Sequence, residues 1–407
     1  MRVLFTTPIL EHPAAGGPQL RIENSIKALS KTCELDIIYR AGAPATDLIE
    51  NTGEYFQKYS SEYHVLTRSI PKNISQKYFS LFERILNRFF DTRITKQAEY
   101  ILKHLERRKI NILWFGYGNI SYPLIKYIKS KRPKLKIVCD TDSVWSRFVL
   151  RELPYTKGIR KLRIWREGKQ KEMEERAWVG LCDVTTAVSK VDAEYYRGIA
   201  EEPGRIRLFS NVIDVESYKL SPKPPEGFKN PSIYLAGSFG HDNSSMNTAT
   251  RWMLDEVFPK VLNANPNVHF YIVGNNSDVG FGHLNGPNIT VTGRLETVLP
   301  YLCNTDVAIV PLKFESGTRF KILEAGACNV PLVSTTLGAE GIPVIDGEHI
   351  LIADEPDDFA NAIIKIIDNK ECARKLATNC NKLINEHFSV ETLVDEAKQI
   401  LKYLNHD

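Results

Sequence analysis

Short apolar runs alternate with longer amphipathic stretches along most of the 407-residue chain. The apolar runs are rich in Val, Ile and Leu without a polar alternation, which is typical of strands buried on both faces of a parallel sheet. The stretches between them repeat apolar residues with a helical period. The pattern therefore predicts an α/β protein. The expected strands are residues 1–7, 34–39, 112–115, 136–139, 183–187, 232–236, 268–274, 288–293, 306–311 and 330–334, and the main expected helices are residues 18–30, 78–109, 157–178, 245–262, 318–327, 357–367, 372–387 and 390–404.

The periodic pattern stops in one long stretch, residues 211–231, which is polar and rich in proline. Such a stretch between two periodic regions is typical of a linker between domains. The length of the chain also favours two or three domains. We therefore expect one Rossmann-like domain in residues 1–210, the linker in 211–231 and a second Rossmann-like domain in 232–388.

Charge is distributed unevenly between the two halves. Residues 1–210 hold 37 Lys and Arg against 24 Asp and Glu, whereas residues 211–407 hold 16 against 25. Residues 84–171 alone contain 23 basic and 7 acidic side chains. This surplus favours an anionic partner, either membrane lipid or nucleic acid, over a face that serves only solubility. Nucleic acid is the weaker choice, because the sequence has no pattern of an RNA-binding, zinc or helix-turn-helix module.

Two predicted helices carry much of this basic charge. Residues 78–109 combine an aromatic face with Arg84, Arg88 and Arg93, a pattern shared by helices on a membrane surface and by helices in a globular core. In residues 157–178 the basic side chains come first and the acidic ones later, which opposes the helix macrodipole. Contact with an anionic surface is therefore one reading of this helix, and a solvated face is the other.

The seven cysteines contain no CxxC pair, and several lie in apolar runs, which favours reduced thiols over metal ligands or disulfides. No apolar run approaches the length of a membrane span, and the chain opens on a strand pattern instead of a leader peptide. We therefore expect a cytoplasmic protein, associated with the inner face of a membrane only at its surface.

The strand, loop, helix and strand between residues 306 and 341 carry the clearest chemical signal. Gly317 lets the loop before the helix approach a ligand closely. The free N–H groups of the first helical turn, with Arg319 and Lys321, suit a diphosphate. Glu324 lies further along the same helix, where its carboxylate can accept hydrogen bonds from ribose hydroxyls. The alternative is an ordinary solvated helix start.

The stretch GTRFKILEAGACNVPLVSTTLGAEGI resembles the nucleotide-sugar site of retaining GT-B glycosyltransferases of the group 1 family. Many members carry two Glu residues separated by seven intervening residues; counted back from Glu324, the first would fall at Ser316, and Glu315 is one place out of register. Gly317, Thr318, Lys321 and Glu324 match the subgroup motif G-T-x-x-K-x-x-E. The resemblance implies a GT-B fold, with two Rossmann-like domains facing each other across a cleft. It also implies that the last helix, in residues 389–407, crosses back to the first domain.

The resemblance also places other donor contacts. It implies that Gly16 and Gly17 approach the donor phosphates from the first domain, and that Arg21 lies on the acceptor side. Gly237 and Ser238 correspond to the turn that meets the donor diphosphate. Gly293 and Arg294 correspond to a turn that lines the nucleobase pocket, and Ser316, Gly317, Thr318 and Glu324 complete the expected donor site.

Asp140 and Asp142 follow the strand at 136–139, at the edge where open α/β sheets bind ligands. We expect Asp140 on the acceptor side. Asp142 could orient an acceptor hydroxyl or act as its base, or these polar residues could only cap the next helix. With Lys321 and Arg319 stabilising the charge of the leaving group, Asp142 completes the expected catalytic set.

These observations lead to one expected function, a retaining, metal-independent hexosyltransferase. It would move a sugar from a nucleotide-diphosphate donor to a hydroxyl of a glycan or lipid-linked acceptor in cell-surface polysaccharide or glycolipid synthesis. The donor is a co-substrate, and no further cofactor and no metal is expected. The partners would be the donor, the acceptor and an anionic membrane that contacts residues 84–171. The alternatives are a sugar-nucleotide epimerase on the same fold and a non-catalytic protein that binds anionic surfaces.

Overall fold

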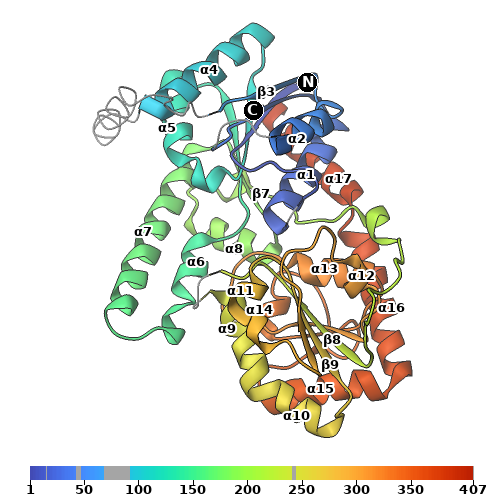
Figure 1. Cartoon of the computed structure of the whole chain (residues 1–407). Coiled ribbons are helices and arrows are strands. Elements are labelled where there is room, and N and C mark those ends of the chain that lie inside the picture. Colours follow the sequence, from blue (N-terminus) through green and yellow to red (C-terminus); the bar gives the residue numbers. More distant parts are fainter. Residues whose placement is uncertain (15, 43–46, 68–91, 241–243, 407) are drawn as a thin grey trace, which may run out of the picture. The chain divides into compact units, whose positions relative to one another are not determined.

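The computed structural model describes residues 1–14, 16–42, 47–67, 92–240 and 244–406. The chain divides into two compact units, each built on its own sheet (Figure 1). Unit 1 consists of Met1–Ser146, Arg166–Ser210 and Leu393–Asp407, and unit 2 consists of Arg147–Trp165 and Asn211–Thr392. Three helices contribute to both units: α6 (Trp145–Leu150), α7 (Ile159–Leu181) and α17 (Val390–His406).

Unit 1 contains a parallel sheet of seven strands in the order β3-β2-β1-β4-β5-β6-β7. The order reverses between β1 and β4, as in doubly wound nucleotide-binding folds. The strands are β1 (Arg2–Thr7), β2 (Glu34–Tyr39), β3 (Glu62–Val65), β4 (Ile112–Gly116), β5 (Lys136–Asp140), β6 (Val184–Ala187) and β7 (Ile206–Leu208). The helices of this unit are α1 (Gly17–Ser30), α2 (Asp47–Gln57), α4 (Thr92–Arg108), η1 (Gly118–Ile120), α5 (Tyr122–Lys131), α8 (Lys190–Ile199) and η3 (Pro203–Arg205).

Unit 2 contains a parallel sheet of six strands in the order β10-β9-β8-β11-β12-β13, which reverses between β8 and β11. The strands are β8 (Ser232–Ala236), β9 (His269–Val273), β10 (Ile289–Val291), β11 (Val307–Val310), β12 (Leu332–Ser334) and β13 (Leu351–Ile352). The helices are η2 (Leu153–Tyr155), η4 (Val215–Tyr218), α9 (Ser245–Trp252), η5 (Met253–Val257), α10 (Phe258–Ala264), α11 (Ser277–Phe281), η6 (Gly282–Leu284), α12 (Leu299–Leu302), α13 (Phe320–Ala327), α14 (Thr336–Ala339), α15 (Pro356–Asp368) and α16 (Lys370–His387).

The two parallel sheets confirm the predicted fold class. Apolar side chains from the strands form the core of each unit, because helices cover the sheets and leave the strands without a solvent face. All strands of one sheet run in the same direction, so the loops that follow them gather at one edge. In such sheets ligands bind outside the carboxyl ends of the strands at the reversal point. In unit 2 these are the loops after β8 and β11.

Several boundaries differ from the sequence-based expectation. The helix expected at 318–327 begins only at Phe320, because Arg319 is extended, with φ −90° and ψ 104°. The helix expected at 245–262 is broken into α9, the π-helical segment η5 and α10, in which Pro259 has no N–H to continue the α-helical register. The strands β3, β7 and β13 were not expected. Residues 78–91 of the expected aromatic and basic helix lie outside the described residues, and α4 accounts for the rest.

None of the helices in the described ranges is long and apolar enough to cross a bilayer. All seven cysteines are free thiols, and Cys139, Cys182 and Cys380 are buried.

Candidate functional site

The loop between β11 and α13 is held in place by side chains from elsewhere in unit 2. Ser245, at the start of α9, donates a hydrogen bond of 2.9 Å from Oγ to Glu315 Oε2. Arg151 Nη1 donates to the carbonyl oxygen of Glu315 over 2.7 Å. Gly317 follows in the left-handed region, with φ +82°, a conformation that a residue with a Cβ adopts only at a cost. The loop therefore has one defined path into the helix.

Lys321 lies in the first turn of α13 and has two carboxylates as electrostatic neighbours. Burial lowers its pKa, and the charges of Glu315 and Glu324 act in the opposite direction. No hydrogen bond from Lys321 Nζ to another group is found within the described ranges. The side chain thus offers an ammonium group in a site where burial strengthens its attraction to an anion.

Glu324 lies one turn further along α13, and Tyr218 from η4 holds its carboxylate. The Tyr218 hydroxyl donates a hydrogen bond of 3.0 Å to Glu324 Oε1. Burial raises the pKa of Glu324, whereas this hydrogen bond and the charge of Lys321 lower it. One carboxylate oxygen is thereby oriented by the protein. The other oxygen, Oε2, has no hydrogen bond in the described part of the chain and is available as an acceptor.

Arg319 is buried at the N-cap of α13, where its guanidinium group contacts backbone carbonyls. It donates hydrogen bonds to the carbonyl oxygens of Gly317 and, over 3.3 Å, of Leu337. Its charge also lowers the pKa of Glu340, after the larger effects of Arg151 and Arg147, and together these outweigh burial. Arg319 thus shapes the loop and adds positive charge to it.

Ser316 and Thr318 are also buried in this loop. The Ser316 hydroxyl, on a side chain only 8% exposed, has no hydrogen-bond partner within the described residues. Buried hydroxyls nearly always have a partner, so this one marks a position where a polar ligand would be satisfied. Thr318 accepts a hydrogen bond at its carbonyl oxygen from Asn211 over 3.5 Å.

The turns after β8, β9 and β10 meet at the same edge of the sheet. The N–H of Gly237 donates to the carbonyl oxygen of Val273 over 3.0 Å, and the N–H of Gly274 donates to that of Gly293 over 3.1 Å. A Cβ on Gly274 would lie 2.1 Å from the carbonyl oxygen of Gly237, so the two turns pack backbone against backbone. The structure therefore brings Gly237 and Gly293 together. Their neighbours Ser238 and Arg294 are exposed.

In unit 1 the expected acceptor-side residues Arg21 and Asp140 form a buried ion pair. Arg21 Nη2, on α1, donates to Asp140 Oδ1 at the end of β5, and Thr186 Oγ1 donates to the same oxygen over 2.7 Å. The two side chains are 2% and 0% exposed. They contact each other within the core of the unit. Gly16 precedes α1 in an extended conformation, and Gly17 is the first residue of that helix.

Asp142 follows β5 and is only half-buried. Its Oδ1 accepts hydrogen bonds from Asn119 Nδ2 over 2.5 Å and from Trp145 Nε1 over 3.0 Å. Burial raises the pKa of Asp142, although these two hydrogen bonds oppose the effect. A carboxyl group whose pKa is raised toward neutrality suits proton transfer.

The structure adds residues that the motif did not indicate. Tyr218 and Ser245 fix the two carboxylates beside Lys321, and Arg151 holds the loop. Arg151 also forms a two-pronged ion pair with Glu340, with distances of 2.8 and 2.7 Å. These partners lie 70 to 189 positions away from the residues that they contact. A local motif gives no signal for them.

Part of the chain is similar to a known protein family and to two curated proteins. Residues 230–369 match the model of the family described as "Glycosyl transferases group 1". One curated relative, an uncharacterized 44.6 kDa protein in the cps region of Klebsiella pneumoniae, is 26% identical over 34% of this chain and 38% of its own length. Another, an uncharacterized glycosyltransferase of Methanocaldococcus jannaschii, is 29% identical over 29% of this chain and 34% of its own length. The chain therefore spans little more than a third of these relatives.

Solved structures match over the full length. Sucrose-phosphate synthase from Thermosynechococcus elongatus is similar with a TM-score of 0.70 and 17% identity, and each chain is covered completely. HepE of Anabaena, solved in complex with UDP-glucose, is similar with a TM-score of 0.67 and 13% identity, again with complete coverage of both chains. The chain thus has the GT-B fold of these glycosyltransferases, and its segment 230–369, which contains Lys321 and Glu324, is similar to the group 1 glycosyl transferase family.

Proposed function

We propose that this protein is a retaining glycosyltransferase that uses a UDP-sugar as its donor. The carrying observation is α13, which presents Lys321 without a hydrogen-bonded partner among the described residues and, one turn later, Glu324 oriented by Tyr218. This pair offers a cation for a diphosphate and an acceptor for ribose hydroxyls. The UDP-glucose in HepE supports uracil as the base.

The donor site of this proposal comprises the loop before α13 and the turns that meet it at the same edge of the sheet. The unpartnered Ser316 hydroxyl and the backbone at Gly317 and Thr318 would contact the donor sugar and diphosphate. The turns at Gly237, Ser238, Gly293 and Arg294 would contact the rest of the nucleotide. The Gly16 and Gly17 loop of unit 1 is proposed as a further phosphate contact.

The chemical step needs stabilisation of the UDP leaving group as its bond to the sugar breaks. Lys321 would supply the direct positive charge, and Arg319, held by carbonyl groups, would add to the potential and fix the loop. Asp142, with its raised pKa, is proposed to orient the acceptor hydroxyl or to take its proton. Arg21 and Asp140 would support this side from within the core of unit 1. In this proposal Lys321 and Arg319, and not a metal ion, stabilise the charge of the diphosphate, so transfer should persist in the presence of a chelator.

The acceptor is proposed to be a glycan or a lipid-linked glycan in surface polysaccharide synthesis. The support is the relative from the cps region of Klebsiella pneumoniae. The protein would work at the inner face of the membrane that carries such acceptors.

The donor proposal is tested by the effect of nucleotides on thermal unfolding. UDP should raise the melting temperature more than GDP, ADP, CMP or dTDP, because a ligand that binds only the native state stabilises it by mass action. Glu324→Gln and Tyr218→Phe should both reduce the UDP shift, since the first replaces one of the two accepting oxygens by an NH2 donor and removes the charge, and the second removes the hydrogen bond that orients the carboxylate. The exposed Glu348→Gln is the matched control and should keep it.

The result would go against the proposal if no nucleotide stabilised the protein, or if Glu324→Gln and Glu348→Gln responded alike. An epimerase would show the same UDP shift. It is distinguished by incubation with UDP-glucose without an acceptor, because an epimerase returns a second UDP-sugar and a transferase does not.

We also propose that α7 contacts an anionic membrane. Ile159, Leu162 and Met173 are 90%, 60% and 71% exposed, and at 100° per residue they fall within a sector of roughly 60° on one side of the helix. Arg166 lies in the same sector and Lys169 about 20° outside it, and both are exposed. Apolar and basic side chains on one exposed face are typical of helices that lie in the interface of an anionic bilayer.

This second proposal is tested by co-sedimentation with vesicles of phosphatidylcholine, with and without phosphatidylglycerol. Binding should need the anionic lipid and weaken with salt. Leu162→Glu should reduce it about tenfold, because it replaces an inserted apolar group by a repelled charge. Ile345→Glu, at a similarly exposed apolar position in unit 2, should bind like the wild type. Equal binding of both variants would overturn the role of α7.

A further inference from the structure

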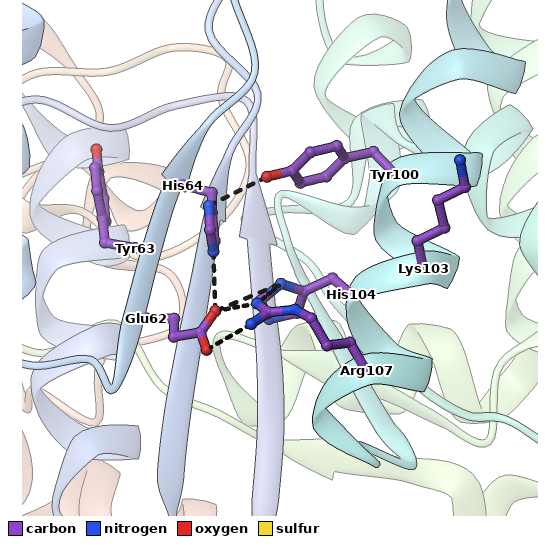
Figure 2. A pocket seen from close by; sticks show the side chains of 7 residues that line it. All are labelled: Glu62, Tyr63, His64, Tyr100, Lys103, His104 and Arg107. Atoms are coloured by element: carbon purple, nitrogen blue, oxygen red, sulfur yellow. Dashed lines mark hydrogen bonds and ion pairs between the residues drawn. The ribbon is translucent and has the colours of Figure 1, made fainter.

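A second cluster of chemically active side chains lies in unit 1, between the edge strand β3 and helix α4 (Figure 2). It lines a cavity of about 560 Å³. Glu62 and His64 are two positions apart on β3 and so share one face of the strand, whereas Tyr63 points away from them. Tyr100, His104 and Arg107 face them from successive turns of α4. None of these residues belongs to the proposed donor site.

Three side chains of the cluster can converge on one cation. His64 Nε2 lies 3.1 Å from Glu62 Oε2, and His104 Nδ1 lies 4.0 Å from the same oxygen. Ligand atoms of the three residues all lie within 4.8 Å of one another. Two atoms bound to one tetrahedral Zn²⁺ at about 2.0–2.1 Å are about 3.3 Å apart. The separation of 3.1 Å between Glu62 and His64 is close to that value, whereas the 4.0 Å between Glu62 and His104 is longer, so the side chains would have to move closer together around the ion.

Each histidine ring is also held through its other nitrogen. His104 Nε2 lies 2.8 Å from Asp36 Oδ2, and an N–H donated to this buried carboxylate leaves Nδ1 with a lone pair toward Glu62. His64 Nδ1 lies 3.1 Å from the Tyr100 hydroxyl. A hydroxyl group can donate or accept, so it fits the tautomer in which His64 Nε2 carries the lone pair. Such second contacts are what orients histidine ligands in metal sites.

At present a guanidinium group lies where the cation would bind. Arg107 donates hydrogen bonds to both oxygens of Glu62, and its Nη2 lies 3.3 Å from His104 Nδ1. The Arg107 side chain is 57% exposed, so it can swing into solvent without leaving a buried gap. A positively charged group, the Arg107 guanidinium, therefore already lies at the centre of the cluster, and a metal ion could displace it.

We propose that Glu62, His64 and His104 form a binding site for a divalent transition-metal ion, with Zn²⁺ as the best match. Two imidazole nitrogens and one carboxylate oxygen suit Zn²⁺ better than Mg²⁺ or Ca²⁺, which take oxygen ligands. The three side chains leave a fourth position open on the side from which Arg107 withdraws. A bound ion would tie the edge strand β3 to α4. The site is a further property of unit 1 and does not rest on the glycosyltransferase proposal.

The test is a titration of the tag-free full chain with Zn²⁺, by calorimetry and by competition with a chromogenic chelator. One equivalent should bind the wild type. His64→Gln and Glu62→Gln should each weaken this binding at least tenfold, because each removes a ligand. Arg107→Gln should strengthen it roughly three- to tenfold, because the competing guanidinium is gone. Co²⁺ in place of Zn²⁺ should give the visible absorption of a tetrahedral site in the wild type and in Arg107→Gln.

Weaker Zn²⁺ binding by His64→Gln and Glu62→Gln, together with stronger binding by Arg107→Gln, would distinguish a metal site from a general loss of structure. His349→Gln removes a histidine in unit 2 and should not change the affinity. Circular dichroism should show that all variants are folded. No substitution of His104 is included, because replacing this buried side chain could itself unfold the protein. The proposal is overturned if neither the wild type nor Arg107→Gln binds Zn²⁺, or if His64→Gln and Glu62→Gln bind it as tightly as the wild type.

Discussion

Replacing Lys321 by Ala should lower kcat/KM for sugar transfer by about 10²- to 10³-fold. This is the range lost when one preorganised group that stabilises transition-state charge is removed. Lys321 is the cation in the first turn of α13 with no hydrogen-bonded partner in the described residues, so no neighbouring side chain already neutralises it through a direct contact. The loss should appear mainly in kcat, because the charge on the leaving diphosphate grows as the bond to the sugar breaks.

The stability of the same variant separates catalysis from folding. Burial lowers the pKa of Lys321, so the unfolded chain binds this proton more tightly than the folded one. Wild-type stability should therefore rise with pH as the pH approaches the ordinary pKa of lysine from below, and Lys321→Ala should lose that rise. At pH 7 the variant should melt no lower than the wild type. Lys365→Ala, at an exposed position on α15, is the control and should keep full activity.

If Lys321→Ala kept its activity, the proposed leaving-group role would be wrong even if UDP still bound. If it lost activity and also melted well below the wild type, the loss would reflect folding instead of catalysis.

The sequence predicts those strands that are buried on both faces, because their residues form a continuous apolar run. β4, with the sequence ILWFG, and β11, with VAIV, are buried at every position and were found from pattern alone. β3, with EYHV, is half-buried at every position because it lies at the edge of the sheet, so its sequence carries no such run. A strand is therefore recognised from the sequence when it is buried on both faces, and is missed when it lies at the edge of the sheet.

The candidate site likewise contains residues that the sequence predicts and residues that only the structure reveals. Lys321 and Glu324 lie on one helix, so their spacing is a local property that a motif can record. The Tyr218 hydroxyl that orients Glu324 comes from 106 positions earlier, and the carboxylate of Asp36 that orients His104 comes from 68 positions earlier. Their positions depend on packing of the completed unit. The sequence analysis did not single out Glu62, His64 or His104, because they come together only where α4 packs beside β3.

Arg21→Met should destabilise the protein by about 3–5 kcal/mol at pH 8, the usual cost of removing one partner from a buried ion pair. Arg21 donates to Asp140 and, over 3.1 Å, to the carbonyl oxygen of Phe209, and its guanidinium lies 5.7 Å from the centre of the Phe209 ring. Met keeps much of the apolar length of the side chain but none of its charge. The variant would leave a carboxylate in the core that has lost its ion pair and still accepts a hydrogen bond from Thr186.

The size of this effect should depend on pH in a defined direction. Burial already raises the pKa of Asp140, and Arg21 and Thr186 oppose that rise. Without Arg21 the pKa of the folded state moves higher, so the folded variant favours the protonated carboxyl. A raised pKa contributes stability that is full below the unfolded pKa and is lost as pH rises toward the folded value. The deficit of Arg21→Met should therefore be smaller at pH 5 than at pH 8, as measured by urea unfolding.

A second substitution identifies the buried charge as the cause. Asp140→Asn in the Arg21→Met background removes the carboxylate, so the double variant should recover part of the loss and lose its pH dependence. Arg197→Met, on the exposed side of α8, should change stability by less than about 0.5 kcal/mol. A deficit that is equal at both pH values would mean that the lost contacts with Phe209, and not the charge of Asp140, account for the effect. In that case Arg21 would act on the acceptor side of the proposed reaction only through packing of the core, and the pairing with Asp140 would contribute little.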